Sequence, residues 1–257
     1  MTLGAAIEFR GVSFATAQGR LLLNEISLAL EEGTTTAILG RSGSGKTTLL
    51  RTVNRMIEPT NGEVLVHGER VRDADVIALR RGMGYVIQET GLFPHFTLER
   101  NVGLVLEITG VAHEERVRRS HELMKAVGLD AASYAGRYPH QLSGGQRQRA
   151  GLARALAADP SILLMDEPFG ALDPLTRAEM QDMLRELMKR LGKTVLMVTH
   201  DLDEALYLAD RIVLMQDGRV VADLTSGEFA GSSLPEIRAY VRAFHRGERE
   251  TKSEAAL

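Results

Sequence analysis

The sequence contains no cysteine and no tryptophan, and its aromatic residues are only seven phenylalanines and five tyrosines. The absence of cysteine excludes a disulfide scaffold, thiol chemistry and any cysteine-ligated metal. No uninterrupted apolar stretch approaches the roughly 20 residues that a membrane-spanning helix needs. The first residues, MTLGAAIEFRGV, lack the basic start and long apolar run of a secretory signal. We therefore expect the chain to remain in the cytoplasm and to reach a membrane only through a partner.

The composition is that of a folded protein with a sizeable core. Hydrophobic residues make up 44% of the 257 residues, and charged residues make up 25%. This balance argues against intrinsic disorder, which is marked by low hydrophobicity and high net charge. The formal net charge is −3. A protein that binds nucleic acid through bulk charge is strongly basic, so we expect no nucleic-acid partner.

Apolar strands alternate with helices along much of the sequence, which indicates a parallel sheet covered on both faces. Strands are expected at 7–9, 21–33, 34–39, 62–69, 84–88, 161–167, 193–200 and 211–218. Helices are expected at 46–56, 113–128, from about 144 to before Pro160, 174–191 and 201–209, with Thr97 capping a further one. Because 97–160 reads as mostly helical, we expect an α/β core interrupted by a helical insert, with a small β layer at the front. The polar residues 245–257 are expected to be a loose tail.

A glycine-rich loop lies between a predicted strand and a predicted helix, and it fits the phosphate-binding pattern of Gly, four residues and Gly-Lys-Thr. Its residues are Gly40, Arg41, Ser42, Gly43, Ser44, Gly45, Lys46, Thr47 and Thr48. Glycines let the backbone N–H groups converge on one anion, and the helix N-terminus adds partial positive charge. Lys46 is expected to reach the β- and γ-phosphates, and the Thr47 hydroxyl to bind Mg²⁺.

Two further motifs follow along the chain. The buried strand ILLMDE, residues 162–167, ends in Asp166 and Glu167. In nucleotide-hydrolysing folds the first of these carboxylates supports Mg²⁺ and the second takes a proton from water, although many buried strands also end in an acid. The pentapeptide LSGGQ opens a helix, and its last four residues are Ser143, Gly144, Gly145 and Gln146. It provides either a helix cap with flexible glycines or a second anion site.

Together and in this order, the three motifs resemble the nucleotide-binding subunit of ATP-binding cassette (ABC) proteins over residues 7–225. The resemblance implies a P-loop NTPase (RecA-like) core with a small antiparallel β layer and a helical insert at about 91–160. It implies an ABC ATPase domain at 1–225, followed by a C-terminal helix and polar tail at 226–257.

The resemblance also assigns roles to single residues. Gln88 resembles the glutamine that touches Mg²⁺ and the attacking water, His200 the histidine that contacts the γ-phosphate, and Asp173 the D-loop aspartate. Glu167 would be the general base, and Thr47, Gln88 and Asp166 would hold Mg²⁺. Two copies would pair head to tail, with each ATP between one copy's phosphate loop and the other copy's LSGGQ, so that Ser143 and Gly145 would bind the γ-phosphate in trans.

The sequence departs from the family at the position that stacks on adenine. The family usually places an aromatic residue there, and that position aligns with Thr16. Phe14 lies two residues earlier, so on a strand it would point to the same side. We expect Phe14 to belong to the core, which leaves the adenine platform unassigned.

One cassette without a membrane span resembles the separate ATPase subunit of an importer. The stretches VNRMIEPT, LRR, GYVIQ and GLFPH resemble the osmoprotectant subfamily, which carries glycine betaine, carnitine or choline. The resemblance implies a peripheral protein on the cytoplasmic face of the cell membrane, bound to an integral membrane permease and served indirectly by a substrate-binding protein. The roughly 30 residues after the cassette are too few for the regulatory modules that many members append. A lipid-trafficking cassette, a soluble non-transport ATPase and an ATP-binding module without hydrolysis remain alternatives.

Overall fold

The computed structural model describes residues 4–88 and 90–254, with side chains up to residue 244. The chain forms two compact units. The first unit contains Met1–Arg72 and Met197–Leu257, and the second contains Asp73–Leu196. Strand β8 (Thr194–Thr199) is where the chain passes from the second unit back to the first.

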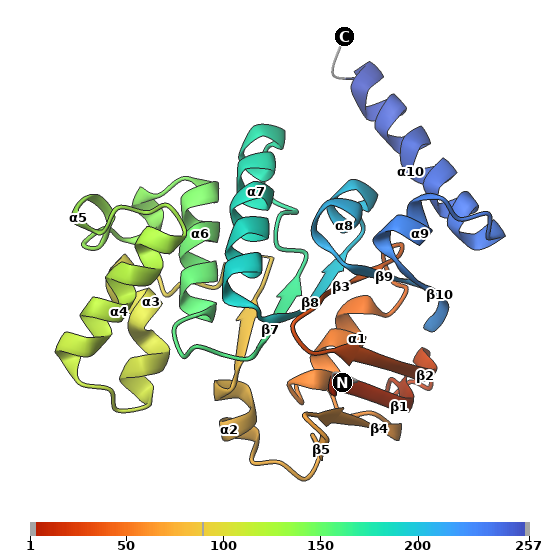
Figure 1. Cartoon of the computed structure of the whole chain (residues 1–257), viewed down its shortest axis with the longest axis horizontal. Coiled ribbons are helices and arrows are strands. Elements are labelled where there is room, and N and C mark those ends of the chain that lie inside the picture. Colours follow the sequence, from red (N-terminus) through yellow and green to blue (C-terminus); the bar gives the residue numbers. More distant parts are fainter. Residues whose placement is uncertain (1–3, 89, 255–257) are drawn as a thin grey trace. The chain divides into compact units, whose positions relative to one another are not determined.

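The first unit contains an antiparallel β layer, a strand–loop–helix segment and the C-terminal elements (Figure 1). Its elements are β1 (Ala5–Ala15), β2 (Leu21–Glu31), β3 (Thr35–Leu39), α1 (Lys46–Val53), β4 (Asn61–Val66), β5 (Glu69–Arg70), α8 (Leu202–Leu208), β9 (Arg211–Gln216), β10 (Arg219–Thr225), α9 (Ser226–Ala230) and α10 (Pro235–Glu254). The β layer has the strand order β2-β1-β4-β5. In the other sheet of this unit, β3 pairs in parallel with β9, and β9 pairs antiparallel with β10.

A β-bulge in β2 interrupts the alternation of buried and exposed side chains that a regular strand shows. Val12 of β1 pairs with Ile26 and Phe14 pairs with Leu23, so β2 carries one extra residue between these pairs. Within the bulge, Glu25 has a φ of 52° and its N–H donates to the Ser13 hydroxyl at 2.9 Å. Leu23 and Ile26 are both buried, three residues apart. The bulge therefore keeps one apolar face on the core through a local change of twist.

The second unit combines helices with two parallel strands. Its elements are α2 (Val76–Arg81), β6 (Met83–Val86), α3 (Leu98–Ile108), α4 (His113–Ala126), α5 (Ala131–Tyr134), the 3₁₀ helix η1 (Pro139–Gln141), α6 (Gly144–Ala155), β7 (Ile162–Asp166) and α7 (Pro174–Leu191). β6 and β7 pair in parallel, with Val86 opposite Met165. All five residues of β7 are buried, as expected for a strand covered on both faces.

Local signals place several helix ends where the sequence predicts them. The Thr97 hydroxyl accepts a hydrogen bond from Arg100 N–H at 3.3 Å, so Thr97 caps α3 as predicted. Helix α7 begins and ends at the predicted residues. Helices α2 and α5 and strand β10 were not predicted.

The prediction of a loose tail is wrong for residues 245–254, because α10 continues to Glu254. Residues 255–257 lie outside the described part of the chain. In the described segments 4–88 and 90–254, no helix combines the length and the hydropathy needed to cross a membrane.

Candidate functional site: a phosphate loop and two carboxylates

The glycine-rich loop is held closely against neighbouring backbone in the first unit. Gly45 has a φ of 99°, and a Cβ at this position would lie 2.6 Å from the Leu22 carbonyl oxygen. A Cβ on Gly40 would lie 2.4 Å from the Met215 carbonyl oxygen. Side chains are therefore excluded at both positions, and the loop backbone can approach the strands on either side of it.

Lys46 is the central charge of this loop. It is 5% exposed, and its ammonium group donates to the carbonyls of Gly40 and Arg41 at 2.8 and 2.9 Å. The Ser44 hydroxyl oxygen is buried and has no hydrogen-bond partner among the residues that the structure describes. The first turn of α1, which follows, contains no acidic residue. A buried cation, an unsatisfied hydroxyl and a helix N-terminus together fit a phosphate group. Thr47 and Thr48 lie in the first turn of α1, both partly exposed.

A second chemical centre lies at the carboxyl ends of β6 and β7 in the second unit. Asp166 ends β7, is 8% exposed and lies 3.5 Å from the Tyr85 hydroxyl, which can donate to it. Glu167 follows with a φ of 47°, a left-handed conformation that residues other than glycine rarely adopt. Such conformations concentrate at functional positions.

The side chains of Gln88 and Glu167 both lie close to Gly170 in this unit. A Cβ on Gly170 would lie 3.3 Å from Gln88 Nε2 and 3.7 Å from Glu167 Oε2. Because Gly170 has no side chain, an amide and a carboxylate can face this space from two different loops. The structure thus brings together two of the predicted catalytic residues, Gln88 and Glu167, next to Asp166.

The LSGGQ segment forms the capped start of α6. The Ser143 hydroxyl accepts from Gln146 N–H at 3.2 Å, and the Gln146 side chain accepts from Ser143 N–H at 3.0 Å. This reciprocal pair is a capping box. Ser143 and Gly144 are exposed, whereas Gly145 is buried, and a Cβ on it would lie 2.5 Å from Thr176 Cγ2. The exposed helix start is therefore the part that a ligand could approach.

Asp173 caps α7 next to this segment. Its carboxylate accepts from Thr176 N–H at 3.1 Å. The Thr176 hydroxyl, followed by backbone N–H groups, lowers the pKa of Asp173 below its ordinary value. Thr176 therefore contacts both the predicted D-loop aspartate and Gly145 of LSGGQ.

His200 lies in the first unit, between the end of β8 and the start of α8. Its side chain is exposed, and the next residue, Asp201, caps α8 by accepting from Glu204 N–H. The His200 carbonyl oxygen accepts a hydrogen bond from the Tyr240 hydroxyl at 2.7 Å. The sequence carries no signal for this contact, because the two residues are 40 positions apart.

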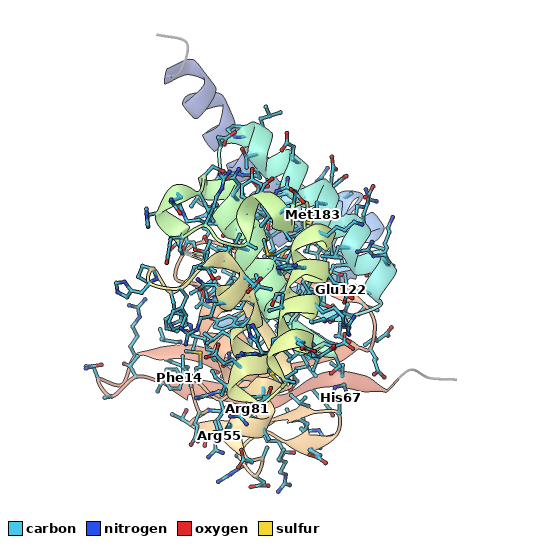
Figure 2. All side chains as sticks on the ribbon, turned by 90° about the vertical axis from the view of Figure 1, so that its left-hand side faces the viewer. Phe14, Arg55, His67, Arg81, Glu122 and Met183 are labelled. Carbon is cyan, nitrogen blue, oxygen red and sulfur yellow. The ribbon has the colours of Figure 1, made fainter. Side chains whose placement is uncertain are left out.

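Phe14 does not belong to the core, contrary to the prediction. Phe14 lies within β1 and is partly exposed, and its side chain is labelled in Figure 2. Its cross-strand partner Leu23 contacts the phosphate loop, since Leu23 Cδ2 lies 3.0 Å from the place of a Cβ on Gly45. Thr16 begins a turn in which Gly19 N–H donates to its carbonyl at 2.8 Å. Phe14 is therefore a partly exposed aromatic residue whose cross-strand neighbour lies next to Gly45.

Fold and loop together define a nucleotide-binding protein of the P-loop class. The family described as ABC transporter matches residues 23–170, which is more than half of the chain. The chain belongs to this family.

Curated relatives of this chain are named for the transport of osmoprotectants. The choline transport ATP-binding protein OpuBA of Bacillus subtilis is 48% identical over 203 residues, which is 79% of this chain and 53% of that protein. The glycine betaine uptake system ATP-binding protein YehX of Escherichia coli is 49% identical over 199 residues, covering 77% of this chain and 64% of that protein. The chain thus spans only about half to two thirds of the length of these relatives. Their names confirm the predicted resemblance to the osmoprotectant subfamily.

Solved structures confirm the predicted fold class. A dimeric post-hydrolysis structure of the ATP-binding cassette MJ0796, bound to ADP and Pi, is 35% identical with a TM-score of 0.77, covering 86% of this chain and 98% of that one. The cbiO1 subunit of a Clostridium perfringens ABC transporter complex is 26% identical with a TM-score of 0.82, covering 95% of this chain and 99% of that one. The chain therefore has the α/β fold of an ABC ATPase domain.

Proposed function

We propose that this chain hydrolyses ATP and powers the import of glycine betaine, choline or carnitine through a separate membrane permease. One observation carries the ATP part. The buried Lys46 ammonium lies within a loop whose glycines exclude side chains, next to an unsatisfied Ser44 hydroxyl. The names of the curated relatives support the choice of cargo.

In this proposal the residues of the loop bind the phosphates. Lys46 would shift its ammonium group from loop carbonyls to the β- and γ-phosphates, and Thr47, Asp166 and Gln88 are the residues that would hold Mg²⁺. Mg²⁺, when bound, would supply positive charge against the phosphate oxygens. The remaining loop residues, Gly40, Arg41, Ser42, Gly43, Ser44, Gly45 and Thr48, surround the phosphates with backbone N–H and hydroxyl groups.

Two side chains act on the reaction itself. Glu167 takes the proton of the attacking water. This assignment is supported by the position of the Glu167 carboxylate near the Gln88 amide beside Gly170. His200 contacts the γ-phosphate from its exposed position after β8. Adenine stacks on Phe14, which is partly exposed, and not on Thr16.

We further propose a head-to-tail dimer of two copies around ATP. The exposed α6 start, with Ser143, Gly144 and the N–H group of Gly145, binds the γ-phosphate of the partner copy, and Gln146 holds this helix start through its capping box with Ser143. Asp173 lies close to that contact through Thr176. The chain then works at the cytoplasmic face of the cell membrane with a permease, and a substrate-binding protein delivers the cargo.

The replacement Glu167→Gln tests the hydrolytic part. We expect this variant to bind ATP and dimerise, with turnover lower by about 100-fold or more, because a positioned general base contributes roughly 10²–10⁴-fold. Phosphate release and size-exclusion chromatography with ATP measure the two properties. Glu179→Gln is the matched control, since Glu179 is an exposed carboxylate of α7 (60% exposed). Near-normal turnover of Glu167→Gln would refute the assignment of the base.

The transport part needs a separate experiment. The tagged chain is purified from detergent-solubilised native membranes, and its partners are identified by mass spectrometry. A stoichiometric multi-span permease supports the proposal, and uptake of labelled betaine, choline or carnitine by that permease in vesicles then tests the cargo. ATPase activity that responds to lipid and not to these amines would favour lipid trafficking. Only soluble, ribosomal or DNA-bound partners would contradict a transport role.

A further inference from the structure

A hydrogen bond connects the C-terminal helix to the loop that carries His200. The Tyr240 hydroxyl of α10 donates to the His200 carbonyl oxygen at 2.7 Å. This carbonyl belongs to the peptide group between His200 and Asp201. The N–H of the same peptide group donates to the Thr199 hydroxyl at 3.0 Å. Both ends of the peptide group are therefore held by side chains, so its rotation would break two hydrogen bonds.

Helix α10 is anchored well enough to hold this contact. Ile237 is 1% exposed, and Tyr240, Val241 and Phe244 are partly buried. These four residues follow the i, i+3, i+4, i+7 spacing of one helical face. α10 packs against β10, and α9, which precedes it, packs against α8. The tyrosine thus extends from a helix that is fixed within its own unit.

We propose that Tyr240 is a positioning residue for His200. The orientation of the peptide group after His200 sets the backbone conformation from which its imidazole extends. Tyr240 therefore links the C-terminal helix to the loop that carries His200. This inference rests on the role proposed above for His200.

The variant Tyr240→Phe removes the hydroxyl and keeps the ring. We expect kcat for ATP hydrolysis to fall about two- to tenfold with KM for ATP unchanged, the range that follows from losing one neutral hydrogen bond. Tyr207→Phe is the matched control, because it removes a hydroxyl from a tyrosine of α8 that is 38% exposed. The control is expected to keep the wild-type kcat.

A double-mutant cycle separates positioning from general stability. In single-turnover measurements with excess protein, Tyr240→Phe is expected to have no further effect once His200 is replaced by Ala, because a residue that acts through another loses its effect with that partner. An equal effect in both backgrounds would indicate a merely structural role and would overturn the proposal.

NMR tests the link between Tyr240 and His200 without an activity assay. The chain has seven histidines, and the imidazole signal of His200 is identified by its loss in His200→Ala. Tyr240→Phe is expected to shift this signal, whereas Tyr207→Phe is expected to leave it in place. The spectra are recorded at a temperature at which circular dichroism shows all variants folded.

A failure of the role proposed for His200 and a failure of the role proposed for Tyr240 give different results. If His200→Ala turns over at the wild-type rate, the proposed role of His200 is wrong. If His200→Ala is impaired while Tyr240→Phe keeps both the wild-type kcat and the His200 signal, only the positioning role of Tyr240 is wrong.

Discussion

The guanidinium group of Arg154 donates a hydrogen bond to the main-chain carbonyl of Gly91 at 2.6 Å. A second bond reaches the carbonyl of Thr90 at 2.7 Å. Both carbonyls belong to the loop that follows Gln88, and both residues have a positive φ. Burial lowers the pKa of Arg154, and the two carbonyls offset the cost of burying its charge. One residue of α6 therefore fixes the loop that follows a predicted catalytic glutamine.

Replacing Arg154 tests this connection. Arg154→Met keeps much of the apolar length and removes both hydrogen bonds, so we expect a loss of about 2 kcal/mol in the free energy of unfolding and about tenfold in kcat. Urea unfolding and phosphate release measure the two quantities. Arg118→Met is the control, because the Arg118 side chain is 57% exposed and surface ion pairs contribute little. Equal behaviour of both variants would contradict a role of Arg154 in the loop.

Gly45→Ala tests the close approach of the phosphate loop to β2. The new Cβ would lie 2.6 Å from the Leu22 carbonyl oxygen at a φ of 99°, so the loop must move away from its position. We expect ATP binding, measured with a fluorescent ATP analogue, to weaken at least about 100-fold. Gly227→Ala is expected to bind normally, because a Cβ there would meet no described atom within 4 Å apart from its chain neighbours and its own helix backbone. Undiminished binding by Gly45→Ala would show that the loop does not depend on this glycine.

Asn101→Leu tests a buried polar residue that organises the loop before α3. Asn101 is 0% exposed. Its amide group donates to the carbonyls of Phe93, Phe96 and Thr97 and accepts from Phe93 N–H. Leucine is similar in size and leaves these groups unpaired, so we expect a loss of about 3 kcal/mol in unfolding free energy. A loss below about 1 kcal/mol in urea unfolding would mean that water replaces the amide.

Asp173→Asn tests the pH dependence of the α7 cap. The pKa of Asp173 is lowered in the folded protein, chiefly by the Thr176 hydroxyl, so its carboxylate stabilises the fold above the unfolded-state pKa of about 3.9. This contribution is lost as the pH falls through the lower folded-state pKa. Asparagine also caps helices, so the substitution removes the charge and keeps the cap. The wild type is expected to be more stable than Asp173→Asn at pH 7, and the difference should vanish at strongly acidic pH. A difference that stays constant with pH would exclude the carboxylate as its cause.

The sequence by itself determined the family motifs and much of the local structure of this protein. The phosphate-loop spacing, the acid pair after β7 and the LSGGQ motif are short patterns, as is the Thr97 cap. Helix ends depend on neighbouring residues, and buried strands depend on the period of the hydrophobic residues. Both signals can be recognised in the sequence alone.

Only the tertiary structure decided which distant residues support these motifs. The structure leaves Phe14 partly exposed in β1, opposite Leu23, although a core position was predicted from the sequence. The bond from Arg154 to Gly91 spans 63 residues, and the bond from Tyr240 to His200 spans 40. A side chain shows no periodic or local signal for a partner so far along the chain, because their contact exists only after the elements between them have packed.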